Sequence, residues 1–290
     1  MKLHASESVW CGYFLVMGAF ATVAGNGRLG LLLTGLASAV VVLARFVPLR
    51  WRLFAGLVWI NFAYALGSEV AKAARVARYD NALVHIDALL GWHAGQWTPS
   101  PFVLDLLSCF YVSFYVLVFA GICLFMRRPA FYTGFALVYA LGTLGYALVP
   151  AAGPFFDWPL PTVGTHVFVI LQGEASKLVT GVDVFPSLHV AASCYVLAWM
   201  IWRWRHTWLP CGLWACGIAA ATVGLRYHYL IDVIAGFALT GVVLSAMQRG
   251  GAFERVPASE IPRSDPSRSN TSRSNISRSN PASSDERTHV

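Results

Sequence analysis

Long apolar segments dominate this chain and constrain its fold more than any other feature. Stretches of mostly uncharged residues recur from about residue 9 to about residue 248, and each is long enough for a helix that crosses a bilayer. Hydrophobic residues make up 57% of the chain and charged residues 12%, and the mean hydropathy of +0.59 is too high for a soluble domain of this size. The sequence therefore predicts an all-α fold, a polytopic bundle of membrane-spanning helices.

Eight segments are predicted to span the membrane, at about 9–24, 29–47, 53–70, 102–126, 131–149, 186–202, 208–224 and 230–248. The first resembles a secretory signal, but a second apolar run follows so closely that an uncleaved helix is the preferred interpretation. Residues 71–100 mix apolar, aromatic and charged side chains, as a segment lying in the headgroup plane does. A substrate-binding role and a simple cap over the bundle both remain open for that segment.

Positively charged loops indicate how the bundle is oriented. Arginines cluster at 45–52, 127–130 and 203–206 and in the tail, and an excess of Lys and Arg marks cytoplasmic loops. The net charge of +7 reports this orientation and does not indicate nucleic acid binding. Both termini are then cytoplasmic. The sequences around His189 and His228 face the periplasm, exterior or lumen, at the outer side of a cytoplasmic (inner) membrane.

Three regions are predicted along the chain. Residues 1–70 supply N-terminal transmembrane helices, the third of which belongs to the core or abuts it, and residues 71–249 form the membrane domain that carries the chemistry. Residues 250–290 repeat Ser-Arg-Ser-Asn, which is typical of a disordered, cytoplasmic tail. The six cysteines fall mostly inside apolar runs and lack the spacing of a disulfide framework or a metal site.

The residues that can carry chemistry are concentrated in Arg226-Tyr227-His228-Tyr229-Leu230-Ile231-Asp232 and Pro186-Ser187-Leu188-His189. His228 and Asp232 are four residues apart where an apolar helix begins, so the carboxylate can hold one imidazole nitrogen. An ionisable group at a membrane boundary is costly and marks a functional site by default. The pattern predicts an oriented imidazole. The alternative is that His228 and Asp232 are interfacial side chains without a function, which extend towards the aqueous phase.

The second stretch places His189 in the first turn of a helix. Pro186 is well placed to start that helix and Ser187 to cap it. A helix N-terminus with a hydroxyl, a histidine and a nearby Arg226 is a suitable seat for a phosphate group. Two histidines then suit phosphoryl transfer, because one can attack phosphorus while the other donates a proton to the leaving oxygen.

Three other functions compete with this hypothesis. A zinc site made from His189, His228 and Asp232 has a known ligand set, but the spacing of Asp232 fits an orienting carboxylate equally well and Arg226 would repel a cation. A serine hydrolase using Ser187 has no accompanying oxyanion motif. A non-catalytic lipid transporter or scramblase would need polar residues through the depth of several helices, whereas they gather at one face.

Two stretches resemble the second and third signature motifs of the type-2 phosphatidic acid phosphatase superfamily: Phe185-Pro186-Ser187-Leu188-His189-Val190 and His228-Tyr229-Leu230-Ile231-Asp232-Val233-Ile234-Ala235-Gly236. They are most similar to its inositol phosphorylceramide synthase-like branch, where Pro-Ser-Leu-His replaces Pro-Ser-Gly-His. Two stretches upstream are similar to weaker signatures of that branch: Ile86-Asp87-Ala88-Leu89-Leu90-Gly91 and Tyr146-Ala147-Leu148-Val149-Pro150-Ala151-Ala152-Gly153-Pro154. The resemblance covers about residues 80–245.

The resemblance implies a six-helix phosphatase-like core, with the first two spans as additions. It makes His228 the nucleophile that forms a phosphohistidine, Asp232 its orienting carboxylate and His189 the general acid and base. It implies no metal and no other cofactor. The expected substrate-binding residues are Arg226, Ser187, Lys177 and Tyr229.

The chain also departs from the superfamily's better-known phosphatases. Those begin with Lys, six residues and Arg-Pro, whereas Arg128-Pro129 here has Gly121 in the lysine position, and Thr222 stands where they place an arginine. Arg226 and Lys177 must replace the missing cations. The expected function is phosphate transfer or hydrolysis on a lipid phosphate ester, with a lipid or polyol acceptor or water. The sequence does not separate the two reactions, because only the occupant of the acceptor site differs.

Overall fold

A computed structural model shows an all-helical protein, and it describes residues 3–160, 167–171 and 180–253. The long helices are α1 (Ala5–Val23), α2 (Gly27–Phe46), α3 (Leu49–Ala73), α5 (Pro101–Leu124), α6 (Pro129–Leu148), α8 (Leu188–Arg203), α9 (Trp208–Gly224) and α10 (Leu230–Arg249). A shorter α4 (Asp80–Leu89) and two 3-10 turns, η1 (Ala94–Gln96) and η2 (Arg205–Thr207), connect them. The described residues contain no β-strand, so the all-α prediction is confirmed.

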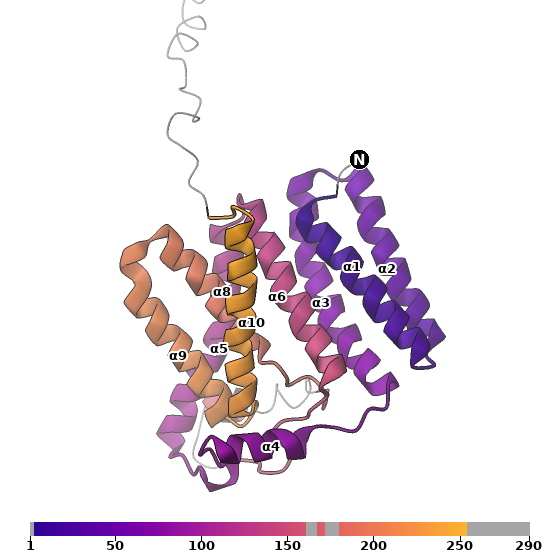
Figure 1. Cartoon of the computed structure of the whole chain (residues 1–290). Coiled ribbons are helices and arrows are strands. Elements are labelled where there is room, and N and C mark those ends of the chain that lie inside the picture. The colour runs from indigo at the N-terminus through magenta and orange to yellow at the C-terminus, as the bar shows by residue number, and fades with distance from the viewer. Residues whose placement is uncertain (1–2, 161–166, 172–179, 254–290) are drawn as a thin grey trace, which may run out of the picture. The chain divides into compact units, whose positions relative to one another are not determined.

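The long helices lie side by side and reverse direction at successive connections, while α4 lies across one end of them (Figure 1). Six are long and apolar enough to cross a membrane: α2, α3, α5, α6, α9 together with η2, and α10. The protein is therefore a multi-pass membrane protein. The predicted count of eight spans is not confirmed, because α1 and α8 are not among the six; α8 has 16 residues and is only about 24 Å long.

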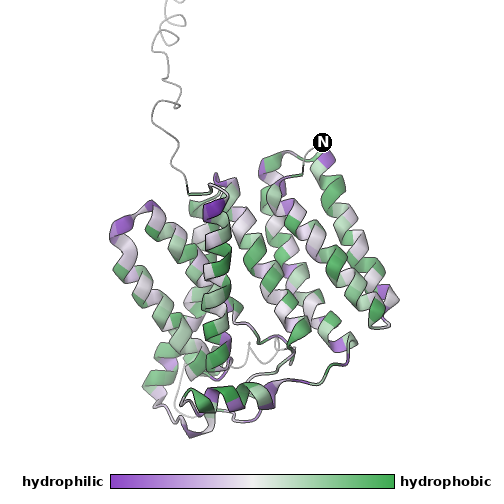
Figure 2. Ribbon diagram, viewed as in Figure 1, coloured by the Kyte–Doolittle hydropathy of each residue, from purple (hydrophilic) through white to green (hydrophobic). Residues whose placement is uncertain are grey.

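The surface of the bundle has the polarity that lipid requires. Hydrophobic colour follows the sides of the helices and hydrophilic colour collects at their ends (Figure 2). Large apolar side chains such as Leu31, Phe119 and Val242 are mostly exposed. Such exposure is unfavourable in water and favourable in a bilayer, where the surrounding solvent is itself apolar.

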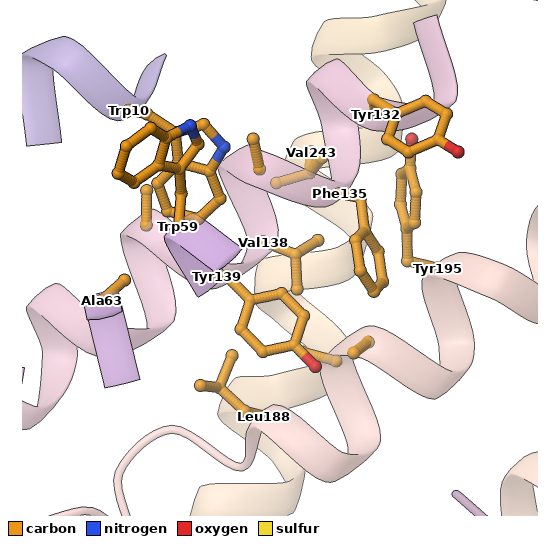
Figure 3. Close-up of a cluster of buried hydrophobic side chains, with 14 of the residues drawn as sticks. Trp10, Trp59, Ala63, Tyr132, Phe135, Val138, Tyr139, Leu188, Tyr195 and Val243 are labelled. Atoms are coloured by element: carbon orange, nitrogen blue, oxygen red, sulfur yellow. The ribbon is translucent and has the colours of Figure 1, made fainter. Parts of the chain in front are cut away.

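Helix α6 is the centre of the bundle, since 67% of its membrane-length window is buried, against 28–33% in the other five candidate spans. It packs against α1, α3, α8 and α10. Aromatic side chains fill these contacts, among them Trp10, Trp59, Phe135 and Tyr195 (Figure 3). The N-terminal helices therefore pack directly against the rest of the bundle, and all described residues form one compact unit.

A buried ion pair joins the N-terminal helices at the end of the bundle away from α4. Glu7 in α1 receives hydrogen bonds of 2.6 and 2.7 Å from Nε and Nη2 of Arg52 in α3. The same guanidinium donates to the carbonyl of Ala44 in α2 at 2.9 Å. Because each polar atom has a partner, this pair avoids the cost of an isolated buried charge.

Candidate active site

The starts of α8 and α10 lie against each other and form the frame of the site. Ser187 is the N-cap of α8, and its hydroxyl accepts from Val190 N–H at 3.4 Å, which confirms the predicted cap. Its own N–H donates to the carbonyl oxygen of Asp232 in α10 at 3.0 Å. The backbones come this close because residue 236 is glycine; a Cβ there would lie 2.7 Å from the Ser187 carbonyl oxygen.

The structure brings the two predicted catalytic histidines together. Nε2 of His228 lies 3.5 Å from Nδ1 of His189, and the ring centroids are 5.6 Å apart at an interplanar angle of 65°. His228 is buried just before the N-cap residue of α10, and His189 lies in the first turn of α8. The fold thus brings ring nitrogens of two residues that are 39 positions apart in the chain next to each other.

Asp232 lies on the other side of the His228 ring. Its Oδ2 is 3.5 Å from Nδ1 of His228, too long for a strong hydrogen bond, and also accepts from Tyr229 N–H at 2.8 Å. The predicted proximity is present, but it does not come from two residues on one helix face. Helix α10 begins at Leu230, and Tyr229 is an extended N-cap residue. His228 therefore approaches Asp232 through the capping turn.

An aromatic wall on α5 covers His189, a feature to which sequence reasoning assigned no role. The rings of Tyr111 and Phe114 each have their centroid 4.6 Å from that of His189, and Tyr115 follows at 6.4 Å. Their spacing in the sequence, i, i+3 and i+4, is the signal that one helix face presents all three. Rings packed on an imidazole exclude water, which strengthens the electrostatic interactions of the site.

Two acidic side chains of α4 also reach the site. Asp87 accepts hydrogen bonds from the backbone N–H groups of Leu230 and Ile231, the first residues of α10. Burial raises the pKa of Asp87, and those two hydrogen bonds lower it. Asp80 accepts from the hydroxyl of Tyr229 at 2.9 Å. Sequence alone assigned neither carboxylate a role: both were charges of an interfacial segment, and Asp87 also lies in one of the weaker signature stretches. Their spacing of seven residues is the signal that places them on one helix face.

Arg226, in the turn between α9 and α10, hydrogen-bonds to two other segments of the chain. Its backbone is left-handed, with φ of 62°. Nη1 donates to the carbonyl of Trp158 at 2.6 Å and Nη2 to the carbonyl of Trp97. Burial lowers the pKa of Arg226. The guanidinium thus fixes the chain around the site, and its predicted contact with phosphate remains a prediction.

The other predicted substrate-binding residues have different surroundings. Ser187 is fully buried and serves as a helix cap. Tyr229 borders a pocket of about 200 Å³ together with Asp87, Trp92 and Trp158. Lys177 lies outside the described residues. A binding role for each of the three stays a prediction.

A further contact ties α3 to the segment before α8. The hydroxyl of Tyr64 donates to the carboxylate of Asp183, three residues before Pro186.

Within the described residues, no group of three or more His, Cys, Asp or Glu side chains is arranged to hold a metal ion. The zinc alternative therefore has no ligand cluster in that part of the chain, and the expected independence of metal stays a prediction.

The fold and the site define a class: multi-pass membrane proteins with two adjacent histidines and a buried carboxylate where helices begin at one end of the bundle. The chain belongs to the PAP2 superfamily, whose sequence model matches residues 81–246. Membership implies phosphatase or phosphotransferase activity on phosphate esters. No curated protein and no solved structure matches the chain. The match begins within α4 and ends within α10, so it includes every catalytic residue predicted from the sequence.

Proposed function

We propose that this protein is an integral membrane enzyme that transfers or hydrolyses the phosphate group of a lipid phosphate ester through a phosphohistidine on His228. One observation carries the proposal: the two ring nitrogens of His228 point to different partners. Nδ1 faces the carboxylate of Asp232 and Nε2 faces His189, each at 3.5 Å. A nucleophilic imidazole needs this division, with one nitrogen held and the other directed at the reacting atom.

The reaction balances with these three side chains alone. Nε2 of His228 attacks phosphorus, the bond from phosphorus to the leaving oxygen breaks, and His189 donates a proton to that oxygen. Asp232 holds the proton on Nδ1 and stabilises the positive charge of the phosphohistidine ring. An acceptor hydroxyl or water then loses its proton to His189 and attacks phosphorus, and the phosphorus–nitrogen bond breaks. The enzyme returns to its starting state without an added cofactor.

The position of the histidine pair supports a lipid as the substrate. His189 is covered by aromatic residues of α5, and the outermost of them, Tyr115, is 54% exposed on the side of the bundle. The aromatic residues that contact the imidazole thus include one that reaches the surface of the bundle. A lipid phosphate can therefore approach the site from the side of the bundle, parallel to the membrane, with its acyl chains still in the bilayer. A water-soluble ester would not use this route.

The acceptor in this proposal is a lipid or polyol hydroxyl, or water in the hydrolytic reaction. The pocket bordered by Trp92, Trp158 and Tyr229 is also lined by Val84 and Asp87 of α4, and it supports entry of a small hydroxylated molecule there. Transfer of a phosphorylated head group onto a lipid alcohol is the version that corresponds to the inositol phosphorylceramide synthase-like branch.

The proposed orientation places this end of the bundle at the outer side of the membrane and both termini in the cytoplasm. The arginine-rich connections α2 to α3, α5 to α6 and α8 to α9 lie at the opposite end (Figure 1). Positive loops favour the cytoplasmic side, and the catalytic end then faces the periplasm, exterior or lumen.

The test is to incubate purified protein in lipid vesicles with phosphatidic acid and a lipid alcohol, following free phosphate and new phospholipid together. Release of phosphate indicates hydrolysis, and a new phospholipid indicates transfer. We expect one of these products with the wild-type protein and neither with His228→Ala. Movement of labelled lipid between leaflets without chemical change, equal in both proteins, would favour the transporter or scramblase alternative.

A further inference from the structure

We propose that Asp87 and Asp80 of α4 are positioning residues of the reaction, which hold the first turn of α10 and thereby the ring of His228. This inference rests on the proposed function. Neither residue is needed for a proton or phosphoryl step. Their role is to join a helix that lies across the end of the bundle to the helix that begins at the catalytic pair.

One face of α4 carries both carboxylates. The buried residues of this ten-residue helix are Asp80, Leu83 and Asp87, which lie at i, i+3 and i+7 and so on the same side. Leu83 belongs to a small apolar cluster that also contains Tyr229. The face of α4 that turns towards the protein thus presents one carboxylate on each side of a leucine that packs against the α10 cap.

Asp87 caps α10 from outside that helix. Its Oδ2 accepts from Leu230 N–H at 2.8 Å and its Oδ1 from Ile231 N–H at 2.9 Å. These are the first two N–H groups of α10, which have no partner within their own helix. A carboxylate at this point also interacts favourably with the positive end of the helix dipole. The contact joins residues 143 and 144 positions apart, so it fixes tertiary structure.

Asp80 holds the residue that follows His228. Its Oδ1 accepts from the Tyr229 hydroxyl at 2.9 Å and from the N–H groups of Ala152 and Gly153 at 2.9 and 3.1 Å. Tyr229 is the N-cap of α10. Asp80 and Asp87 therefore hold consecutive parts of one turn, from residue 229 to residue 231.

That turn determines the geometry of the catalytic residues. His228 directly precedes it, and Asp232 directly follows it and accepts a hydrogen bond from the N–H of Tyr229, the N-cap residue. The 3.5 Å separations from His228 to Asp232 and to His189 both change if the turn shifts. A displacement of about 1 Å costs up to roughly 100-fold in rate when a reaction depends on positioned groups.

The experiment compares Asp87→Asn, Asp87→Ala and Asp87→Glu with the wild-type protein in turnover of phosphatidic acid. We expect kcat to fall about 10- to 100-fold in Asp87→Ala. The fall should be smaller in Asp87→Asn, which keeps one acceptor oxygen, and smallest in Asp87→Glu. KM should stay within about twofold of the wild-type value in all three variants. Inhibition by orthovanadate, which mimics the phosphoryl transition state, should weaken by the same factor as kcat falls. Asn81→Ala is the matched control, because Asn81 is exposed on the same helix, and it should leave kcat, KM and inhibition unchanged.

Each alternative result has a defined meaning. Wild-type kcat in folded Asp87→Ala or Asp87→Asn overturns the proposal, and so does a rise in KM at unchanged kcat, which indicates a substrate ligand. If Asp87→Ala does not fold, the same comparison is made with Asp87→Asn. The proposed function is tested separately by the wild type and His228→Ala. Equal activity in those two refutes the phosphohistidine reaction, whatever the Asp87 variants do.

Discussion

The environment of His228 determines what the site can do at the scale of single residues. Asp232 Oδ2 accepts from the Tyr229 N–H and lies 3.5 Å from His228 Nδ1, while Asp232 Oδ1 and His228 Nδ1 are both buried without a hydrogen-bond partner among the described residues. Within the described residues His189 has no such carboxylate beside it, and its ring packs against those of Tyr111 and Phe114. Two imidazoles in such different surroundings are suited to different roles, one as an oriented nucleophile and the other as a proton carrier.

Substitutions of the three residues should separate these roles. We expect His228→Ala to abolish turnover and His189→Ala to lower kcat about 10²- to 10⁴-fold, the contribution typical of a general acid. Asp232→Asn should cost less than either, because the amide oxygen can still cap Tyr229 and the nucleophile survives in a poorer orientation. Initial rates with phosphatidic acid, together with melting curves of the detergent-solubilised variants, measure this. Near wild-type rates for His228→Ala would exclude the assigned chemistry.

The proposed chemistry also requires no metal ion. We expect full activity in EDTA without added divalent cations, because the imidazoles supply both nucleophile and proton. The check is the initial rate after dialysis against chelator, with phosphate release as the readout and a zinc-dependent phosphatase as the positive control for chelation. Activity lost in chelator and restored by zinc would support the zinc alternative.

At the scale of elements, the contact between α8 and α10 determines whether the two histidines meet. Gly236 on α10 faces the Ser187 carbonyl, the side chain of Val190 and the N–H of Ala191 on α8. Thr240, one turn further along, donates from its hydroxyl to the carbonyl of Ala191 at 2.9 Å. Close backbone approach and a hydroxyl cross-link together hold the two catalytic helices at one spacing, as small residues do in membrane bundles.

Gly236→Ala should therefore push the two helices apart. The new Cβ would lie 2.7 Å from a backbone oxygen that cannot rotate away, and overpacking of this kind costs about 1–3 kcal/mol. We expect a lower melting temperature and a lower kcat. Gly241→Ala is the matched control on the same helix, because its Cβ would meet nothing within 4 Å, and it should leave both quantities unchanged or slightly improved. Equal effects of the two substitutions would contradict the importance of this contact.

At the scale of the whole molecule, the alternating direction of the helices places the arginine-rich connections and the candidate active site at opposite ends of the bundle. The connections rich in arginine lie at one end of the bundle, and α4, the histidine pair and the α9 to α10 turn lie at the other (Figure 1). Helices α1 and α3 pack against the central α6, and α3 also reaches the site end through Tyr64 and Asp183. The N-terminal helices thus support the segment from which α8 begins.

The proposed orientation can be tested by labelling single cysteines in a background where the six native cysteines are replaced. His85 on α4 and Arg127 between α5 and α6 are both exposed and lie at opposite ends. We expect His85→Cys to react with an impermeant maleimide in intact cells and Arg127→Cys to react only after lysis. The reverse labelling would place the histidine pair in the cytoplasm and remove the argument for an outer-leaflet substrate.

Several features follow from local sequence alone. Apolar runs predicted α9 at 208–224, as observed, and α10 to within one residue. The Ser187 cap and the closeness of His228 to Asp232 were also correct, because both depend on near neighbours in the chain, although the second arises through the capping turn of α10 and not from one helix face. The two signature motifs were sufficient to identify the superfamily, and they contain the three residues now found together. These properties needed no knowledge of how distant segments pack.

Only the tertiary structure decided how the site is supported. Sequence predicted Arg226 as a phosphate ligand, which stays a prediction, but gave no sign of its hydrogen bonds to the carbonyl groups of Trp97 and Trp158. Sequence assigned no positioning role to Asp80 or Asp87, whereas Asp87 caps α10 across 143 positions of the chain and Asp80 accepts from the hydroxyl of Tyr229, the N-cap residue of that helix. A side chain's partners are set by which segments meet, and such long-range contacts leave no periodic pattern in the sequence. The residues predicted to be catalytic could therefore be identified from the chain, and the contacts that surround them could not.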